Sequence, residues 1–248
     1  MKHSHAVHFL LAIPMKLVAF DAFNTLFRLK DHPGITYAKV ASRYGVAVDK
    51  LRSKTQFVSA YREMASSYPN FGYGSGILVE DWWKRVVFTT LTEAGASKQS
   101  LDPVIDELAL ELFRYYQSRD AVVKFDDVDN TLRRLQSQNV VLGVISNSDS
   151  RTTHILESIG IRRYFKFILL SHEVGFMKPD RRIFDEARQS AEYQSALYVG
   201  DDFEKDSAAM QAGWSVKIID RTESLQPSIQ VIKSLNEVYL IKRGMTEA

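Results

Sequence analysis

The chain has 248 residues, of which 45% are hydrophobic and 25% charged, and its formal net charge is +2. This composition is typical of a folded protein and excludes an intrinsically disordered chain. The small net charge, with basic residues spread along the chain, gives no reason to expect a nucleic-acid or membrane-surface partner. No window is apolar over the length that a membrane helix requires. The absence of cysteine excludes disulfides, thiolate metal sites and thiol catalysis, and it is compatible with a reducing, cytoplasmic location.

Residues 1–14 come before the first recognisable element, and we predict that they form a loose extension. They include His3, His5 and His8, as a metal-binding tract would, but a frayed terminus is the preferred interpretation. The apolar run over residues 9–13 is too short for a signal peptide and leads directly into a predicted strand. We therefore expect the folded part to begin near Met15.

Short, continuous apolar runs alternate with amphipathic stretches along the rest of the chain. The apolar runs predict strands at residues 16–20, 140–145, 165–170, 196–199 and 216–219. Runs of this kind are typical of strands that are covered on both faces. The amphipathic stretches between the later strands predict helices at residues 129–138, 152–159, 181–191 and 206–212. This order predicts an α/β fold with a doubly wound parallel sheet.

A long stretch, residues 30–125, separates the first predicted strand from the second. It contains a glycine-rich break at residues 70–76 and few strand-like runs. Its periodicity predicts helices at residues 34–44, 49–66, 79–94 and 103–116. Because it is too long to be a loop, we predict an inserted helical cap domain. Residues 15–29 and 126–248 would then form the α/β core domain.

Polar side chains follow the ends of the predicted strands. Asp21, Ser146 and Asp201 each lie at a strand end or one step beyond it, and Lys178 lies in the loop after the third strand. Ligands bind outside the carboxyl ends of the strands in open α/β sheets. We therefore expect these four residues, from four separate loops, to converge on one crevice.

Such a group suits chemistry on a phosphate. Asp21 would attack phosphorus and form an aspartyl-phosphate. Asp21 and Asp201 would hold a hard cation through oxygen atoms, and Mg²⁺ is the expected cofactor. Ser146, with the backbone amides around Asn147, can donate to a phosphoryl oxygen. Lys178 would neutralise the charge of nucleophile and phosphate together.

The polar segments at residues 21–26, 144–147, 178–180 and 199–206 resemble, in order and in spacing, the four motifs of the haloacid dehalogenase-like hydrolase superfamily. The resemblance extends from about residue 16 to about residue 219 and includes a helical cap after the first motif. It implies a Rossmann-like core and a hydrolase of small phosphorylated molecules. Tyr61-Arg62 and the segments at residues 69–72 and 81–83 resemble one branch of this family more closely.

The resemblance assigns roles to individual residues. The candidates are catalytic Asp21, Ser146 and Lys178, substrate-binding Thr25 and Asn147, and metal-binding Asp21, Phe23 (through its backbone carbonyl), Asp201 and Asp206. For Asp206, orientation of Lys178, contact with a metal-bound water and a helix N-cap all stay open. Asp202 is interpreted as a turn residue in preference to a second metal ligand.

Phe23 departs from the pattern of the family's phosphatases. Residues 21–23 are similar in position to the Asp-x-Asp motif of those enzymes, whose second aspartate serves as general acid and base. Phe23 occupies the position of that second aspartate. General acid–base help is commonly worth about 10²–10⁴-fold, so we expect slow or narrow phosphatase activity on good leaving groups. A catalytically weak or inactive binding or regulatory protein is the alternative. The family's dehalogenases also have an aromatic residue there, but they tend to lack a pair such as Gly200-Asp201.

The predicted cap is rich in aromatic residues. Phe71, Tyr73, Trp82 and Trp83 could line a substrate entrance, but the core of the cap is the preferred interpretation. His154 and His172 lie outside the motifs and are interpreted as structural residues.

Overall fold

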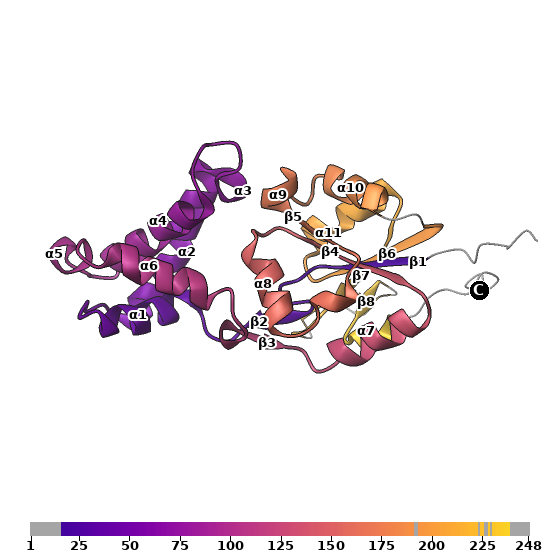
Figure 1. Cartoon of the computed structure of the whole chain (residues 1–248), viewed down its shortest axis with the longest axis horizontal. Coiled ribbons are helices and arrows are strands. Elements are labelled where there is room, and N and C mark those ends of the chain that lie inside the picture. The colour runs from indigo at the N-terminus through magenta and orange to yellow at the C-terminus, as the bar shows by residue number, and fades with distance from the viewer. Residues whose placement is uncertain (1–15, 191–192, 223, 226–227, 229, 239–248) are drawn as a thin grey trace, which may run out of the picture.

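The computed structural model describes residues 16–190, 193–222, 224–225, 228 and 230–238. The predicted loose extension, residues 1–14, lies outside the described residues. Figure 1 shows a sheet with helices packed around it and a separate group of helices to one side. Within the described ranges, no helix is both long and apolar enough to cross a membrane.

Six strands form a parallel sheet in the order β5-β4-β1-β6-β7-β8. They are β1 (Lys16–Phe20), β4 (Val141–Ser146), β5 (Phe167–Leu170), β6 (Ser195–Gly200), β7 (Ser215–Ile219) and β8 (Val231–Ile232). The five predicted strands are confirmed with small shifts at their ends. The edge strand β8 was not predicted, because two residues are too few to give a periodic signal.

Both faces of the sheet are covered. Val18 and Phe20 of β1 belong to a hydrophobic cluster with α7 (Val128–Ser137) and α8 (Arg151–Ser158). The alternate residues Leu17 and Ala19 belong to a second cluster, with α10 (Arg182–Ser190) and the 3₁₀ helix η3 (Ser207–Ala212). Because neighbouring residues of a strand point to opposite faces, these clusters lie on the two sides of the sheet. The predicted doubly wound α/β fold is confirmed.

The short helices around the sheet differ most from the predicted ones. The predicted helix at residues 206–212 is divided into α11 (Phe203–Asp206) and η3. The side chain of Asp202 accepts a hydrogen bond from the Lys205 amide at 3.1 Å and is the N-cap of α11. Asp206 stands at the N-cap position of η3, but its side chain makes no capping hydrogen bond there. The remaining short elements are α9 (Ser171–Val174), η1 (Arg119–Ala121), η2 (Arg162–Tyr164) and η4 (Leu235–Glu237).

Residues 33–116, here called the helical region, contain six helices. They are α1 (Pro33–Arg43), α2 (Lys50–Ser67), α3 (Pro69–Gly72), α4 (Val79–Glu93), α5 (Lys98–Leu101) and α6 (Ile105–Tyr115). The helical region is joined to the sheet by a two-stranded antiparallel ribbon of β2 (Phe27–Leu29) and β3 (Val122–Lys124), in which Leu29 pairs with Val122. Figure 1 shows this ribbon between the two parts. The ribbon was not predicted, because each strand has only three residues.

The segment after β7 is tied to α7 by one carboxylate. Asp127, which is one-tenth exposed, accepts two hydrogen bonds from Arg221 at 2.7 and 3.0 Å. It also accepts one from the Ser234 hydroxyl and one from the Leu235 amide, both at 2.8 Å. The loss of Asp127 would leave four donor groups without this acceptor, two of them on the charged guanidinium of Arg221.

We expect Asp127→Ala to lower the free energy of unfolding by about 2–4 kcal/mol, because breaking one side of a buried ion pair leaves the other charge uncompensated. Urea unfolding at pH 7 measures this loss. Asp126→Ala is the matched control, since Asp126 is the neighbouring carboxylate and is exposed. Equal losses in the two variants would contradict the role of Asp127.

Candidate active site

The carboxyl ends of the central strands bring together the four residues that the sequence singled out. Asp21 follows β1, Ser146 ends β4, and Asp201 follows β6. These three residues and Lys178 line the same cavity. The parallel pairing of β1 with both β4 and β6 places the three strand ends next to one another. The expected convergence is therefore observed.

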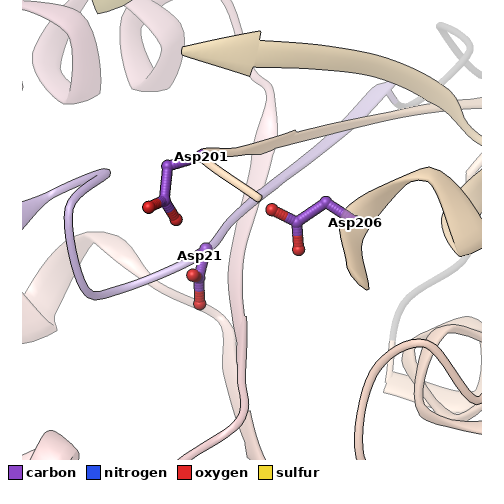
Figure 2. A group of neighbouring side chains, drawn as sticks. All are labelled: Asp21, Asp201 and Asp206. Carbon is purple, nitrogen blue, oxygen red and sulfur yellow. The ribbon is translucent and has the colours of Figure 1, made fainter. Parts of the chain in front are cut away.

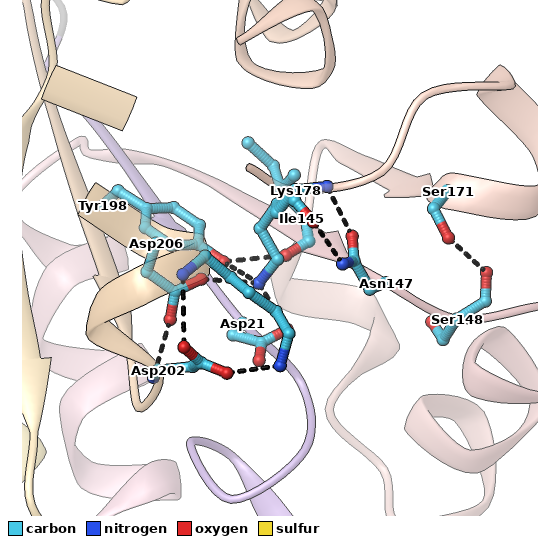
Figure 3. Close-up of polar contacts among 10 residues, drawn as sticks. Asp21, Ile145, Asn147, Ser148, Ser171, Lys178, Tyr198, Asp202 and Asp206 are labelled. Carbon is cyan, nitrogen blue, oxygen red and sulfur yellow. Dashed lines mark hydrogen bonds and ion pairs between the residues drawn. The ribbon is translucent and has the colours of Figure 1, made fainter. Parts of the chain in front are cut away.

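Lys178 is the centre of the polar contacts. Its side chain is buried, and its Nζ lies 2.7 Å from Oδ1 of Asp206 and 3.2 Å from Oδ1 of Asp21. Nζ also donates a hydrogen bond to the Tyr198 hydroxyl at 2.7 Å, as Figure 3 shows. Burial lowers the pKa of Lys178, but Asp21 and Asp206 outweigh burial and hold this pKa above its usual value. The lysine is thus a fixed, charged group beside Asp21.

Tyr198 is a site residue that sequence reasoning missed. Its hydroxyl accepts the hydrogen bond from Lys178 and donates one to the Ile145 carbonyl at 2.9 Å. The side chain is fully buried, and burial together with the nearby carboxylates raises its pKa well above the usual value. Tyr198 therefore holds the lysine as a neutral phenol. A polar side chain inside an otherwise apolar strand was the available signal.

Three carboxylates gather around this lysine. Asp21, Asp201 and Asp206 each offer one oxygen within 4.8 Å of those of the other two. Figure 2 shows the three carboxylates near one another, Asp21 at the end of β1 and Asp201 and Asp206 on the segment that follows β6. Burial and the neighbouring charge of Asp21 raise the pKa of Asp201 to about 6. The cluster thus holds more negative charge than Lys178 alone balances.

Asp206 is more deeply buried than Asp21 and Asp201 and is not part of the cavity lining. It is fully buried, and while its Oδ1 accepts from Lys178, its Oδ2 accepts from the Asp202 amide at 3.0 Å. A Cβ atom at Gly200 would lie only 2.0 Å from Oδ2 of Asp206. Glycine at position 200 thus leaves the space that the Asp206 carboxylate fills. Of the open roles for Asp206, this geometry favours the orientation of Lys178.

Of the two predicted substrate-binding residues, Asn147 lines the cavity and Thr25 does not. The Asn147 side chain accepts from the Lys178 amide at 2.7 Å and donates to the Lys178 carbonyl at 2.8 Å, so it fixes the backbone that presents the lysine. Asn147 also lines the cavity. Thr25 is fully buried and is not part of the cavity lining, so the structure does not bring it together with the other candidates.

Phe23 lines the cavity that contains Asp21. Its ring packs edge-on against Phe27 with the ring centres 4.8 Å apart. The side chain that replaces the family's acid therefore forms part of an apolar wall.

The cavity continues from the carboxylates into the helical region and has a volume of about 450 Å³. Six aromatic side chains of the helical region line it, and we call them the aromatic wall: Tyr37, Phe57, Tyr61, Phe71, Trp83 and Tyr116. Trp82 is fully buried instead and belongs to the core of the helical region, as expected. Tyr73 is half exposed and lies outside the lining. The preferred interpretation holds for Trp82 and Phe71, which are buried members of this core. Phe71 and Trp83 also line the cavity, and Tyr73 belongs neither to the buried core nor to the lining.

The two histidines lie outside the cavity lining. The ring of His172 packs edge-on against Tyr73, and Nδ1 of His154 lies 3.2 Å from the Ser150 carbonyl. Neither residue faces the carboxylates, so their interpretation as structural residues agrees with their positions.

The loop after β4 contacts the helical region through a group that the sequence did not reveal. Asp149 is buried and pairs with Arg151, whose Nε and Nη2 lie 2.9 and 2.8 Å from its two oxygens. Trp83 donates its indole N–H to Asp149 at 2.9 Å, and the Arg151 guanidinium lies 4.1 Å from the centre of a Trp83 ring. Burial raises the pKa of Asp149, but Arg151 outweighs burial and holds this pKa below its usual value.

The fold and the site define an α/β protein with an acid–lysine centre at the carboxyl ends of its parallel strands. A family model described as haloacid dehalogenase-like hydrolase matches residues 15–213. The chain therefore belongs to the haloacid dehalogenase-like hydrolases. The branch indicated by Tyr61-Arg62 and the neighbouring motifs is that of haloacid dehalogenase-like hydrolase domain-containing protein 3. The Bos taurus protein of that name is 31% identical over 222 residues (88% of this chain, 87% of the relative), and the Homo sapiens protein is 33% identical over 194 residues (77% and 76%).

Solved structures agree on the fold. A 2-haloacid dehalogenase from Pseudomonas syringae has a TM-score of 0.61 at 25% identity, covering 90% of this chain and 95% of that protein. A putative hydrolase of the family from Bacillus subtilis, YfnB, was solved with bound magnesium. It has a TM-score of 0.66 at 18% identity, covering 90% of this chain and 96% of that protein.

Proposed function

We propose that this protein is a magnesium-dependent phosphatase of small phosphorylated molecules that uses Asp21 as its nucleophile. One observation carries the proposal: the buried ammonium group of Lys178 joins Asp21 to Asp206 at the polar end of a cavity of ligand size. A buried cation beside the nucleophile offsets the charge of an incoming phosphate. The helical region would act as the cap that encloses the substrate.

The carboxylates fit a hard divalent cation. Oδ1 of Asp21 is buried, and its contact among the described residues is the ion pair with Nζ of Lys178 at 3.2 Å. With all three acids ionised, their charge exceeds that of Lys178 by two units, and the group is built of oxygen donors. Asp21, Asp201 and the Phe23 carbonyl would hold Mg²⁺. Asp206 would hold Lys178, because both of its oxygens already accept hydrogen bonds.

The chain's own residues account for the first half of the reaction. Oδ of Asp21 attacks phosphorus, and the bond between phosphorus and the leaving oxygen breaks with its electron pair on that oxygen. Ser146 donates a hydrogen bond to a phosphoryl oxygen, and Lys178 neutralises the charge of Asp21 and the phosphate. Bound Mg²⁺ would supply further charge neutralisation between the two anions.

Water then attacks phosphorus, the bond to Asp21 breaks, and inorganic phosphate forms. The proton that the water loses has no acceptor at Phe23 and passes to solvent. Hydrolysis of the aspartyl-phosphate is therefore expected to be the slow half of the reaction.

We expect Asp21→Asn to reduce phosphate release by about 10³-fold or more, because an amide cannot replace a carboxylate nucleophile. The measurement is inorganic phosphate released from a panel of phosphate monoesters and acetyl phosphate in Mg²⁺. Removal of Mg²⁺ with a chelator should abolish release, and its return should restore it. Asp126→Asn is the matched control at an exposed carboxylate. No release from any substrate, or full activity in Asp21→Asn, would sink the proposal.

A binding or regulatory protein without turnover is the second candidate, and the observation that favours it is the missing acid at Phe23. It requires a phosphate mimic to bind wild type and Asp21→Asn alike, with no phosphate released by either. Calorimetric titration with inorganic phosphate in Mg²⁺, beside the release assay, separates this candidate from the phosphatase.

Dehalogenation is the third candidate, favoured by Phe23 and by the likeness to a 2-haloacid dehalogenase. The three clustered carboxylates weigh against it, because an uncharged carbon–halogen bond needs no cation to offset repulsion. Chloride release from 2-chloropropionate, unaffected by a chelator, would favour this candidate over the phosphatase.

We further propose a small phosphorylated substrate, without nucleic-acid or membrane partners, and a cytoplasmic location. The small net charge supports the absence of nucleic-acid and membrane partners, and the lack of cysteine supports the location. Cell fractionation checks the location.

A further inference from the structure

The cavity has two chemically different ends. The polar end holds Asp21, Ser146 and Lys178, and the other end is the aromatic wall of the helical region. The wall's rings form a connected set: Tyr37 and Phe57 have centres 5.5 Å apart, and Tyr61 and Trp83 have centres 5.9 Å apart. Phe71 stacks on Trp83 at 6.1 Å with an angle of 26°. A phosphate at Asp21 would therefore extend its leaving group toward flat, apolar surfaces.

The residues that line the cavity provide little to protonate a leaving group. Phe23 has no proton to give. The two other acids of the lining apart from Asp21 and Asp201 are engaged in ion pairs, Asp149 with Arg151 and Asp202 with Lys205. Burial raises the pKa of the three tyrosines of the aromatic wall, so these phenols are poor proton donors. With Asp201 assigned to the cation, a leaving group departs as an anion or takes its proton from water.

We infer that the substrate is an aryl phosphate, a monoester whose leaving group is a phenolic anion with a flat aromatic body; the inference rests on the proposed phosphatase function. A phenol loses its proton near pH 10, as tyrosine does, whereas water, and an aliphatic alcohol like it, keeps its proton to a far higher pH. A phenolate is thus expelled without the acid that position 23 lacks. Its ring matches the aromatic wall, where offset and edge-on ring contacts are favourable.

The step balances without an added reactant. Asp21 forms a bond to phosphorus, the phosphorus–oxygen bond to the ring breaks, and the electron pair stays on the phenolate oxygen. The phenolate takes its proton from solvent after release. The aromatic wall binds and orients the ring, and it takes no part in the transfer of charge.

The first test compares phenyl phosphate with ethyl phosphate as substrates of wild type in Mg²⁺. We expect kcat/KM for phenyl phosphate to exceed that for ethyl phosphate by about 10²-fold or more. A general acid is commonly worth about 10²–10⁴-fold, and its absence slows only the ester with the poorer leaving group, ethyl phosphate. Equal values for the two esters would overturn the inference. Phosphate release from acetyl phosphate, lost in Asp21→Asn, would in that case leave the proposed function standing. No release from any of the three would sink both.

The second test separates ring binding from leaving-group chemistry. Phe57→Leu keeps an apolar side chain in α2 but removes a ring of the wall, and we expect KM for phenyl phosphate to rise by roughly threefold to tenfold. KM for acetyl phosphate, which has no ring, should change by less than about twofold. The matched control is Val58→Ala, the next residue of α2, which is exposed and lies outside the lining. An equal rise in KM for both substrates in Phe57→Leu would contradict binding of the ring by the wall.

Discussion

Phe23→Asp is expected to raise kcat/KM for ethyl phosphate by about 10²–10⁴-fold, the usual contribution of general acid–base catalysis. The introduced carboxyl group would stand two residues from Asp21 and face the same cavity. In the first step it would give a proton to the leaving oxygen, and in the second it would take one from the attacking water. The gain should be small for phenyl phosphate, whose leaving group needs no proton. Steady-state kinetics on both esters measure the difference.

The control for this gain is Phe23→Asn, which has the same size and polarity but transfers no proton at neutral pH. Both variants lose the contact between the rings of Phe23 and Phe27, so both should unfold at a similarly lowered temperature. A gain in Phe23→Asn equal to that in Phe23→Asp would mean that a wider cavity, and not proton transfer, limits the wild type. No gain in either variant would contradict the claim that a missing acid restrains turnover.

Lys178→Met is expected to lower the free energy of unfolding by about 3–5 kcal/mol near pH 8 in the absence of Mg²⁺. Removal of one partner from a buried ion pair leaves uncompensated charge, and here three carboxylates depend on one ammonium group. Methionine keeps most of the volume of the lysine stem, so loss of packing is a minor cause. Urea unfolding of wild type and variant under the same conditions measures the loss.

The loss should depend on pH in a defined direction. The pKa of Asp201 is raised by burial and by Asp21 from 3.8 to about 6. A carboxyl group whose pKa is higher in the folded state favours folding at low pH, and this contribution is lost as the pH rises through the folded-state value. Because the charge of Lys178 lowers the pKa of Asp201, its removal raises this pKa further in the variant. The deficit of Lys178→Met should therefore shrink as the pH falls toward about pH 4.

Two further results would support the electrostatic cause of this loss. Lys178→Met combined with Asp206→Asn should lose less stability than the sum of the single variants, because the second change removes a charge that the first leaves unpaired. Added Mg²⁺ should restore part of the lost stability by binding to the folded state. A deficit that is additive and constant from pH 8 to pH 4 would instead indicate a packing defect.

The sheet could be predicted from sequence because its five longer strands are nearly continuous apolar runs. Leu17 and Val18 illustrate the reason: neighbours in the chain, they face opposite hydrophobic clusters, so neither position tolerates a polar residue. β2, β3 and β8 escaped prediction because two or three residues carry no measurable period. Their pairing depends on partners that are distant in sequence.

The site was predictable where chemistry and position coincide, as in Asp21, Ser146 and Asp201 at the ends of strands. Tyr198 was not, because a tyrosine in an apolar strand resembles a core residue until its hydroxyl is seen on Lys178. Arg151 was missed for a similar reason, since its contacts with Trp83 join two segments that are far apart in the chain. Periodicity alone does not predict which side chains of different helices and strands contact one another.

The ribbon of β2 and β3 allows the helical region to be replaced by another insert without a change in the sheet. Leu29 and Val122 are paired residues of the ribbon, so the chain enters and leaves the helical region at positions only about 5 Å apart. A short turn can close that distance, and an insert of another size can open from it, without moving the ends of β1 and β4. Related proteins can therefore change their substrate range by changing the insert that the ribbon carries. The acid–lysine centre at the strand ends keeps its geometry.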